Sequence, residues 1–184
     1  MTEKKTVSSR VHVIVMMGIV LLGVIAVTVI DLFIQPPYAV KSALKVLLFS
    51  AMPVAYSLFD KQLELKSLFR LGGGKKGIIE AVLWGSGVFA FIILAYILIG
   101  RFFDFTQITG NLEQSMGIDR DNFVLVALYI SFCNSLLEEF FFRGFACLKL
   151  QQYVSRRTAY MFSSLSFAAY HVAMMWVAFE PPLV

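Results

Sequence analysis

The chain has 184 residues, of which 59% are apolar and only 15% are charged, whereas about 25% of the residues are charged in a typical soluble domain. A chain of this size buries about two thirds of its surface on folding, so much of the apolar surface would remain in water. The composition therefore excludes a soluble monomer, a disordered chain and a collagen-like fibre, and it predicts a membrane protein. The net charge of +4 does not indicate a nucleic-acid partner, because the basic residues fall between apolar runs.

The first apolar segment predicts a membrane anchor at about 11–34. No formal charge occurs in the twenty residues from Val11 to Ile30, which is enough for about 30 Å of helix. The segment is too long for a signal peptide, and no cleavage site of small residues follows it. We therefore expect it to be retained, with Pro36 and Pro37 ending the helix.

Four further apolar segments predict four more helices, at about 39–59, 78–100, 122–149 and 158–179. The second helix contains Pro53, and its uncharged run is short. We expect Lys41 and Lys45 to extend this span by reaching towards the membrane surface. The predicted fold class is thus an all-α, polytopic bundle of five transmembrane helices, forming a single integral membrane domain over 1–184.

The distribution of basic residues predicts the orientation of the bundle. With the N-terminus in the cytoplasm, most lysines and arginines flank the membrane on the cytoplasmic side. Four basic residues would lie on the opposite side, and these are Lys41, Lys45, Arg101 and Arg120. The excess inside favours a multi-pass protein of the cell membrane with a cytoplasmic N-terminus.

Three charged residues interrupt the fourth apolar segment, and charges inside a membrane helix indicate function by default. They are Glu138, Glu139 and Arg143. In a helix, Glu139 and Arg143 are i,i+4 neighbours that can form an ion pair. Glu138 lies about 100° further round the helix, so we expect its carboxylate to face a different environment.

His171 is the matching candidate in the fifth segment. It lies ~21 Å from the cytoplasmic marker Arg157, and Glu138 lies ~16 Å from the corresponding marker Lys149. The short connection makes the two helices antiparallel neighbours, so the carboxylate and the imidazole are expected to meet at similar depth. A buried glutamate beside a histidine is suited to activating water as a general base.

Two other interpretations of these charges stay open. A Glu–Arg pair can simply hold a bundle together, and a lone histidine can bond a neighbouring helix. Intramembrane carboxylates also relay protons in transporters. A transporter predicts an internal repeat and paired discontinuous helices, and the sequence shows neither.

Together the two segments resemble the CPBP family of intramembrane proteases, also called the CAAX protease or Abi family. Glu138-Glu139-Phe140-Phe141-Phe142-Arg143 matches the pattern EExxxR, and Phe167-Ala168-Ala169-Tyr170-His171 matches FxxxH. The ordered pair on consecutive membrane helices carries the resemblance, which extends from about Asn122 to Phe179. The family includes the type II CAAX prenyl endopeptidases and bacteriocin self-immunity proteins.

The resemblance implies an intramembrane endopeptidase that hydrolyses peptide bonds with glutamate-activated water. Glu138 corresponds to the water-activating glutamate, Glu139 and Arg143 to its supporting partners, and His171 to the histidine that positions the water. The implied partners are membrane lipid and a peptide or protein substrate. Two kinds of chemistry remain open: one that uses a divalent metal such as zinc, and one in which glutamate acts without a metal. Glu138 and His171 alone are too few for a three-ligand zinc site.

The family's third motif, HxxxN or HxxxD, is missing from the sequence, since no histidine follows His171. We therefore expect the chain to be a fragment of a longer protein with more helices, and to be inactive or nearly so on its own, because an oxyanion donor is commonly worth about 10²–10³ in rate. The alternative function is a catalytically inactive membrane binding or immunity protein of the same fold.

Overall fold

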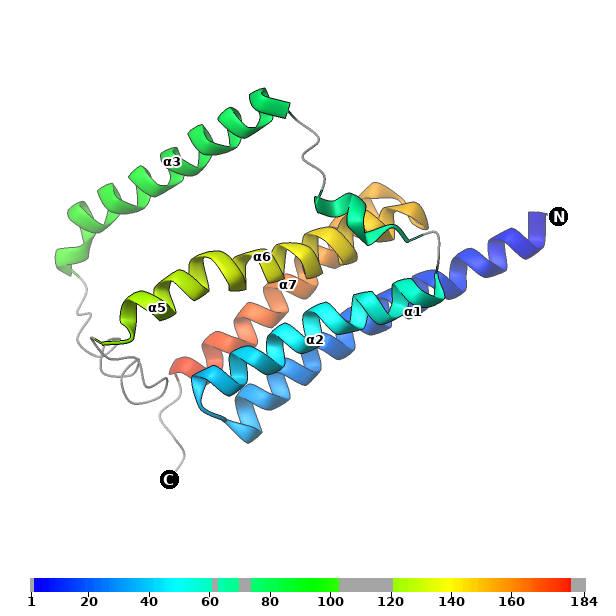
Figure 1. Cartoon of the computed structure of the whole chain (residues 1–184), viewed down its shortest axis with the longest axis horizontal. Helices are drawn as coiled ribbons and strands as arrows, with labels where there is room; N and C mark the ends of the chain where they lie inside the picture. Colours follow the sequence, from blue (N-terminus) through cyan, green and yellow to red (C-terminus); the bar gives the residue numbers. More distant parts are fainter. Residues whose placement is uncertain (1, 61–62, 70–73, 103–120, 180–184) are drawn as a thin grey trace.

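The computed structural model describes residues 2–60, 63–69, 74–102 and 121–179, and the side chains between Arg10 and Met174 within those ranges. Over these residues the chain forms helices and no strand, and Figure 1 shows most of the helices running alongside one another. The all-α class of the prediction is therefore confirmed.

The first two helices form an antiparallel pair (Figure 1). Helix α1 (Thr2–Val29) begins earlier than the predicted 11 and continues into a wider π-helical segment, η1 (Ile30–Ile34). Gln35 then takes a left-handed conformation with φ of 44°, and Pro36 and Pro37 follow, so the chain reverses direction. Helix α2 (Tyr38–Phe59) runs back along α1 with Pro53 inside it.

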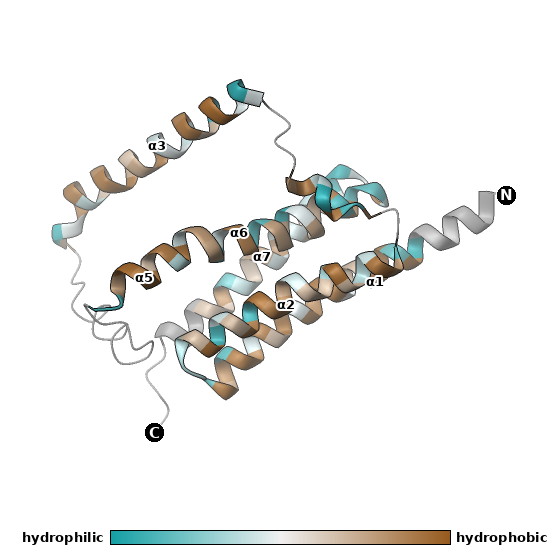
Figure 2. Cartoon of the chain, in the orientation of Figure 1, coloured by the Kyte–Doolittle hydropathy of each residue, from teal (hydrophilic) through white to brown (hydrophobic). Residues whose placement is uncertain are grey.

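Helix α3 (Gly74–Ile99), which continues into η3 (Gly100–Phe102), lies apart from the other helices in Figure 1. A short 3₁₀ helix, η2 (Leu65–Phe69), precedes it and packs on the fourth helix. None of the residues in α3 is buried, and Figure 2 shows apolar residues along most of its length. Such a surface is compatible with lipid rather than water as the surrounding solvent.

The fourth predicted helix is a continuous helical run whose winding changes along its length. Its successive segments are α5 (Phe123–Leu128), η4 (Tyr129–Asn134), α6 (Ser135–Glu138), η5 (Glu139–Lys149) and η6 (Leu150–Gln152). Both η4 and η5 are π-helical, and the Ser135 hydroxyl donates to the Ile130 carbonyl five residues back, at 3.1 Å. Helical segments of this kind are rare and are often found at functional sites.

Helix α7 (Arg156–Phe179) packs against η5, as the short connection predicts. The Ser155 hydroxyl accepts a hydrogen bond from the Thr158 amide at 3.1 Å, which caps the start of the helix. Deeper in the bundle, the buried Ser163 hydroxyl donates to the Phe142 carbonyl at 2.8 Å. This bond fixes α7 directly to η5.

Four helices in the described part are long and apolar enough to cross a membrane. They are Arg10–Ile34, Tyr38–Phe59, Gly74–Phe102 and Phe123–Gln152. Helix α7, the fifth helix of the prediction, is not among these four. The polytopic membrane architecture is thus confirmed.

The core of the bundle is an aromatic stack that joins α2, η5 and α7. The rings of Phe49 and Phe141 are parallel within 2°, with centroids 4.1 Å apart, and Phe49, Phe141 and Tyr170 are fully buried. Gly23 of α1 lies directly against this stack, because a Cβ atom there would come within 2.8 Å of the Phe141 ring. The glycine therefore lets α1 approach η5 closely.

A second, polar cluster closes the end of the bundle at which α1 begins and α2 ends. His12 Nδ1 lies 2.6 Å from the Tyr56 hydroxyl and 3.3 Å from Asp60 Oδ2. The Tyr153 hydroxyl also donates to Asp60 Oδ2. Burial, together with the Asp60 carboxylate, raises the pKa of Tyr153, so its hydroxyl stays protonated and remains a donor.

The close approach of α1 to η5 at Gly23 predicts that adding a single methyl group at this position destabilises the protein. Replacing Gly23 with alanine forces the new Cβ against a fully buried ring, and we expect this overpacking to lower the free energy of unfolding by about 1–3 kcal/mol. The matched control is Gly85→Ala in α3, where no atom lies within 4 Å of the added Cβ. Thermal unfolding in detergent should give a lower midpoint for Gly23→Ala only, and equal midpoints would contradict this packing.

The polar cluster predicts a cost for removing one hydroxyl. Tyr153→Phe leaves the Asp60 carboxylate, which is 6% exposed, without one of its donors. We expect a loss of about 1.5–3 kcal/mol in unfolding free energy, the range for a hydrogen bond to a charged group. Tyr160→Phe removes an exposed hydroxyl and serves as the control. Similar stability of the two variants in chemical unfolding would show that the Tyr153–Asp60 bond contributes nothing.

Candidate active site

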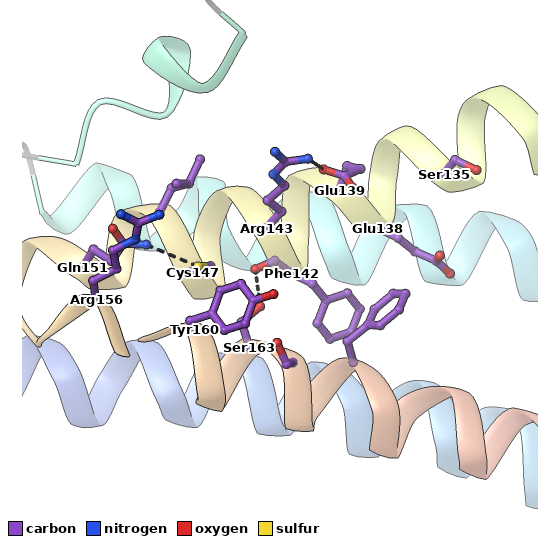
Figure 3. A pocket seen from close by; sticks show the side chains of 13 residues that line it. Ser135, Glu138, Glu139, Phe142, Arg143, Cys147, Gln151, Arg156, Tyr160 and Ser163 are labelled. Atoms are coloured by element: carbon purple, nitrogen blue, oxygen red, sulfur yellow. Dashed lines mark hydrogen bonds and ion pairs between the residues drawn. The ribbon is translucent and has the colours of Figure 1, made fainter. Parts of the chain in front are cut away.

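Glu138 is the last residue of α6, at the point where the helical run widens into η5. Its side chain is 13% exposed and extends towards α2 and α7. Glu139 is the next residue, about 100° further round the helix, and Figure 3 shows its side chain pointing in a different direction from that of Glu138. The structure therefore separates the two adjacent carboxylates, as the sequence predicts.

The Glu138 carboxylate is held by three hydrogen-bond donors, and all three bond the same oxygen atom, Oε1. Lys45 Nζ lies 2.7 Å from this oxygen, Asn134 Nδ2 lies 3.2 Å away, and the Tyr170 hydroxyl lies 3.3 Å away. The donors come from three different segments, which are α2, η4 and α7. Glu138 is thus a point at which three parts of the bundle meet.

Lys45 is therefore not where the sequence analysis puts it. Its side chain is only 9% exposed and forms an ion pair with Glu138, so the prediction that Lys45 reaches the membrane surface is wrong. Lys41, one turn earlier, pairs with Asp31 at 3.0 Å, and the Asp31 side chain is 2% exposed. In both cases a buried carboxylate pairs with a lysine of α2, because an unpaired charge inside the bundle would be costly.

Glu139 and Arg143 form the predicted i,i+4 pair, with Arg143 Nη1 donating to Glu139 Oε2 at 3.3 Å. Their side chains are 59% and 72% exposed, so the pair faces away from the packed core. An exposed pair of this kind contributes little to stability, at most about 1 kcal/mol. The pairing is confirmed, and the part that the two residues play in catalysis remains a prediction.

The structure does not bring His171 into contact with Glu138. His171 Nδ1 lies 3.1 Å from the Phe167 carbonyl, and its ring packs on the Phe167 ring with centroids 4.2 Å apart. In the described part of the chain, the neighbouring Tyr170 contacts Glu138 in its place. The Tyr170 and His171 rings meet edge to face at 4.9 Å, so His171 adjoins the site through Tyr170.

An open groove of about 800 Å³ lies between the fourth helix and α7 (Figure 3). Glu138, Glu139 and Arg143 contribute to its wall, and so does Phe167 of the second motif. The remaining residues that line it are Ser135, Phe142, Cys147, Leu148, Gln151, Arg156, Tyr160, Ser163 and Ser164. The groove is lined by both polar and apolar side chains, and it is large enough to hold part of a peptide beside a carboxylate.

The residues around Glu138 do not fit a catalytic metal. Within the described residues, no three His, Cys, Asp or Glu side chains are grouped so that they could hold a metal ion. The nearest charged group to the Glu138 carboxylate is the Lys45 ammonium, which has no lone pair to donate and would repel a cation. We therefore derive no catalytic step through a metal.

Sequence reasoning missed Lys45, Asn134 and Tyr170. Two signals could have found them. Lys45 stands between apolar residues on both sides in the second segment, and an intramembrane lysine is itself a functional indication. Asn134 precedes Glu138 by four residues, the spacing at which helical side chains meet. Tyr170 has no such local signal.

Comparison with known proteins gives one match. Residues 120–182 match the family model described as Type II CAAX prenyl endopeptidase Rce1-like. The matched segment contains both motifs, Glu138–Arg143 and Phe167–His171. No curated protein matches the chain, and neither does any solved structure. Over residues 120–182 the chain is thus similar to the type II CAAX prenyl endopeptidases, which agrees with the resemblance carried by its two motifs.

Proposed function

We propose that this protein is an intramembrane endopeptidase that hydrolyses peptide bonds with water activated by Glu138. One observation carries the proposal. A carboxylate that is almost fully enclosed by the bundle borders an open groove, and three donors hold it by a single oxygen. A fixed carboxylate beside an open groove suits general base catalysis, in which the base must lie within hydrogen-bond reach of the water whose proton it takes.

In the proposed reaction, Glu138 takes a proton from water as the water oxygen attacks the carbonyl carbon of a peptide bond. The resulting tetrahedral intermediate collapses when the carbon–nitrogen bond breaks. The proton held by Glu138 then passes to the leaving nitrogen, which departs as an amine, and the other product is a carboxylic acid. Water supplies all the atoms that are added, so no further reactant is needed.

The other predicted residues take supporting roles in this proposal. The Phe167 carbonyl can only accept a hydrogen bond, so the proton of the neutral His171 ring lies on Nδ1. Nε2 is then an acceptor that can orient the attacking water. The Glu139–Arg143 pair spans one turn on the groove side of η5, and we propose that it keeps this wall of the groove in place.

A second candidate function is a catalytically inactive membrane binding or immunity protein of the same fold. The Lys45–Glu138 ion pair favours this function, because holding helices in register can be the sole role of a buried ion pair. In that case the groove binds a peptide or protein partner without cleaving it. The two functions differ in whether Glu138 is needed for hydrolysis.

The test is cleavage of a fluorescence-quenched peptide with a prenylated CAAX end, by the protein expressed from its complete coding sequence and reconstituted in liposomes. We expect Glu138→Gln to lower kcat/KM by about 10²–10⁴-fold, the usual contribution of a general base. The matched control is Glu80→Gln in α3, whose side chain is 60% exposed, and it should cleave at the wild-type rate. The same peptide without the prenyl group shows whether that group is recognised.

Two outcomes would count against the proposal. Wild-type cleavage by Glu138→Gln would remove this residue from the mechanism. A wild-type protein that binds both peptides and cleaves neither would favour the inactive binding protein.

A further inference from the structure

The two oxygens of the Glu138 carboxylate are held differently, and the role that we infer from this difference rests on the proposed function. All the hydrogen bonds that Glu138 receives from the described residues end on Oε1. A carboxylate oxygen has about two lone-pair positions, so three donors saturate Oε1. In the described part of the chain, Oε2 accepts no hydrogen bond. The two oxygens of one carboxylate are therefore in different environments.

Lys45 is the strongest of the three donors. Its 2.7 Å contact is the shortest of the three, and it is the only one in which the donor is charged. Charge-assisted hydrogen bonds are about twice as strong as neutral ones. The ammonium is therefore the group that decides where Oε1 lies.

The Lys45 ammonium is itself fixed in place. Asn134 Oδ1 accepts a hydrogen bond from Nζ at 2.6 Å, and the same amide donates to Glu138 Oε1 through Nδ2. Nζ also lies 4.9 Å from the centre of the Tyr170 ring, within the range of a cation–π contact. Asn134 and Tyr170 each contact both Lys45 and Glu138. Neither charged group can therefore move without disturbing these contacts.

Stability alone is a weak reason for such a pair. Replacing a buried ion pair with apolar residues of similar volume is often neutral or stabilising, because removing two charges from water costs as much as their attraction returns. Holding the base of a reaction in one orientation is a different role, since a displacement of 1 Å in a reacting group can cost about 10²-fold in rate.

We propose that Lys45 is a positioning residue for Glu138. Held by Asn134 and Tyr170, its ammonium binds Oε1 and leaves Oε2 as the oxygen that faces the water and receives its proton.

Helix α2 offers a matched control one turn away. Lys41, whose side chain is 25% exposed, forms an ion pair with the buried Asp31, with an Nζ–Oδ1 distance of 3.0 Å. This pair does not include Glu138. Lys41→Met therefore removes the ion-pair partner of the buried Asp31 carboxylate, between α2 and η1, and replaces none of the three donors of Glu138.

The experiment measures kcat and KM for the same peptide with five proteins in liposomes: wild type, Lys45→Met, Lys45→Arg, Lys41→Met and Glu138→Gln. We expect Lys45→Met to lower kcat by about 10²-fold with little change in KM, and Lys45→Arg to recover part of the loss. Lys41→Met should keep the wild-type kcat. If Lys45→Met does not fold, Lys45→Gln replaces it, because the amide keeps a donor without the charge and should still lower kcat.

Each result separates this inference from the proposed function. An inactive Glu138→Gln together with a wild-type kcat for Lys45→Met would overturn the role of Lys45 and leave Glu138 as the base. Equal losses of kcat in Lys41→Met and Lys45→Met would reduce Lys45 to a structural residue. Full activity of Glu138→Gln would overturn the proposed function itself.

Discussion

The ion pair between Lys45 and Glu138 is the contact on which the arrangement of the site depends. An unpaired charge inside a membrane bundle costs several kcal/mol, so the carboxylate and the ammonium must stay together. Because they come from segments 93 residues apart in the chain, their pairing fixes α2 against the fourth helix. The stacked rings of Phe49 in α2 and Phe141 in η5 lie one turn further along the same two helices and set the same register. A polar contact and an apolar contact thus hold the two helices in one alignment.

The fourth helix divides the chemistry of the site between its two sides. Glu138 faces the bundle, where it is held by a cation, an amide and a phenol. Glu139 and Arg143 pair with each other on the exposed side, and both line the groove. One pair is enclosed and the other is accessible, so two adjacent glutamates have different environments. That difference allows one of them to serve as a base while the other is part of the surface.

The sequence predicts the local features of this site and misses those that depend on packing. The five helices follow from apolar runs, and the Glu139–Arg143 pair follows from helical spacing within a single segment. Lys45 lies near the start of its helix, where a lysine that reaches the membrane surface has the same sequence pattern as one that turns inward. The depth of His171 along its helix does not show which face of that helix is turned towards Glu138. Tyr170, one residue earlier, is the side chain that contacts Glu138. Both features depend on how helices distant in sequence pack together.

A double-mutant cycle on the Lys45–Glu138 pair tests the central claim most directly. The free energy of unfolding is measured for wild type, Lys45→Met, Glu138→Leu and the double variant in the same detergent. Each single variant leaves a buried charge without its partner and is predicted to lose about 3–5 kcal/mol, whereas the double variant should lose less than either. Losses that simply add in the double variant would show that the two residues do not interact, and would contradict this account of the site.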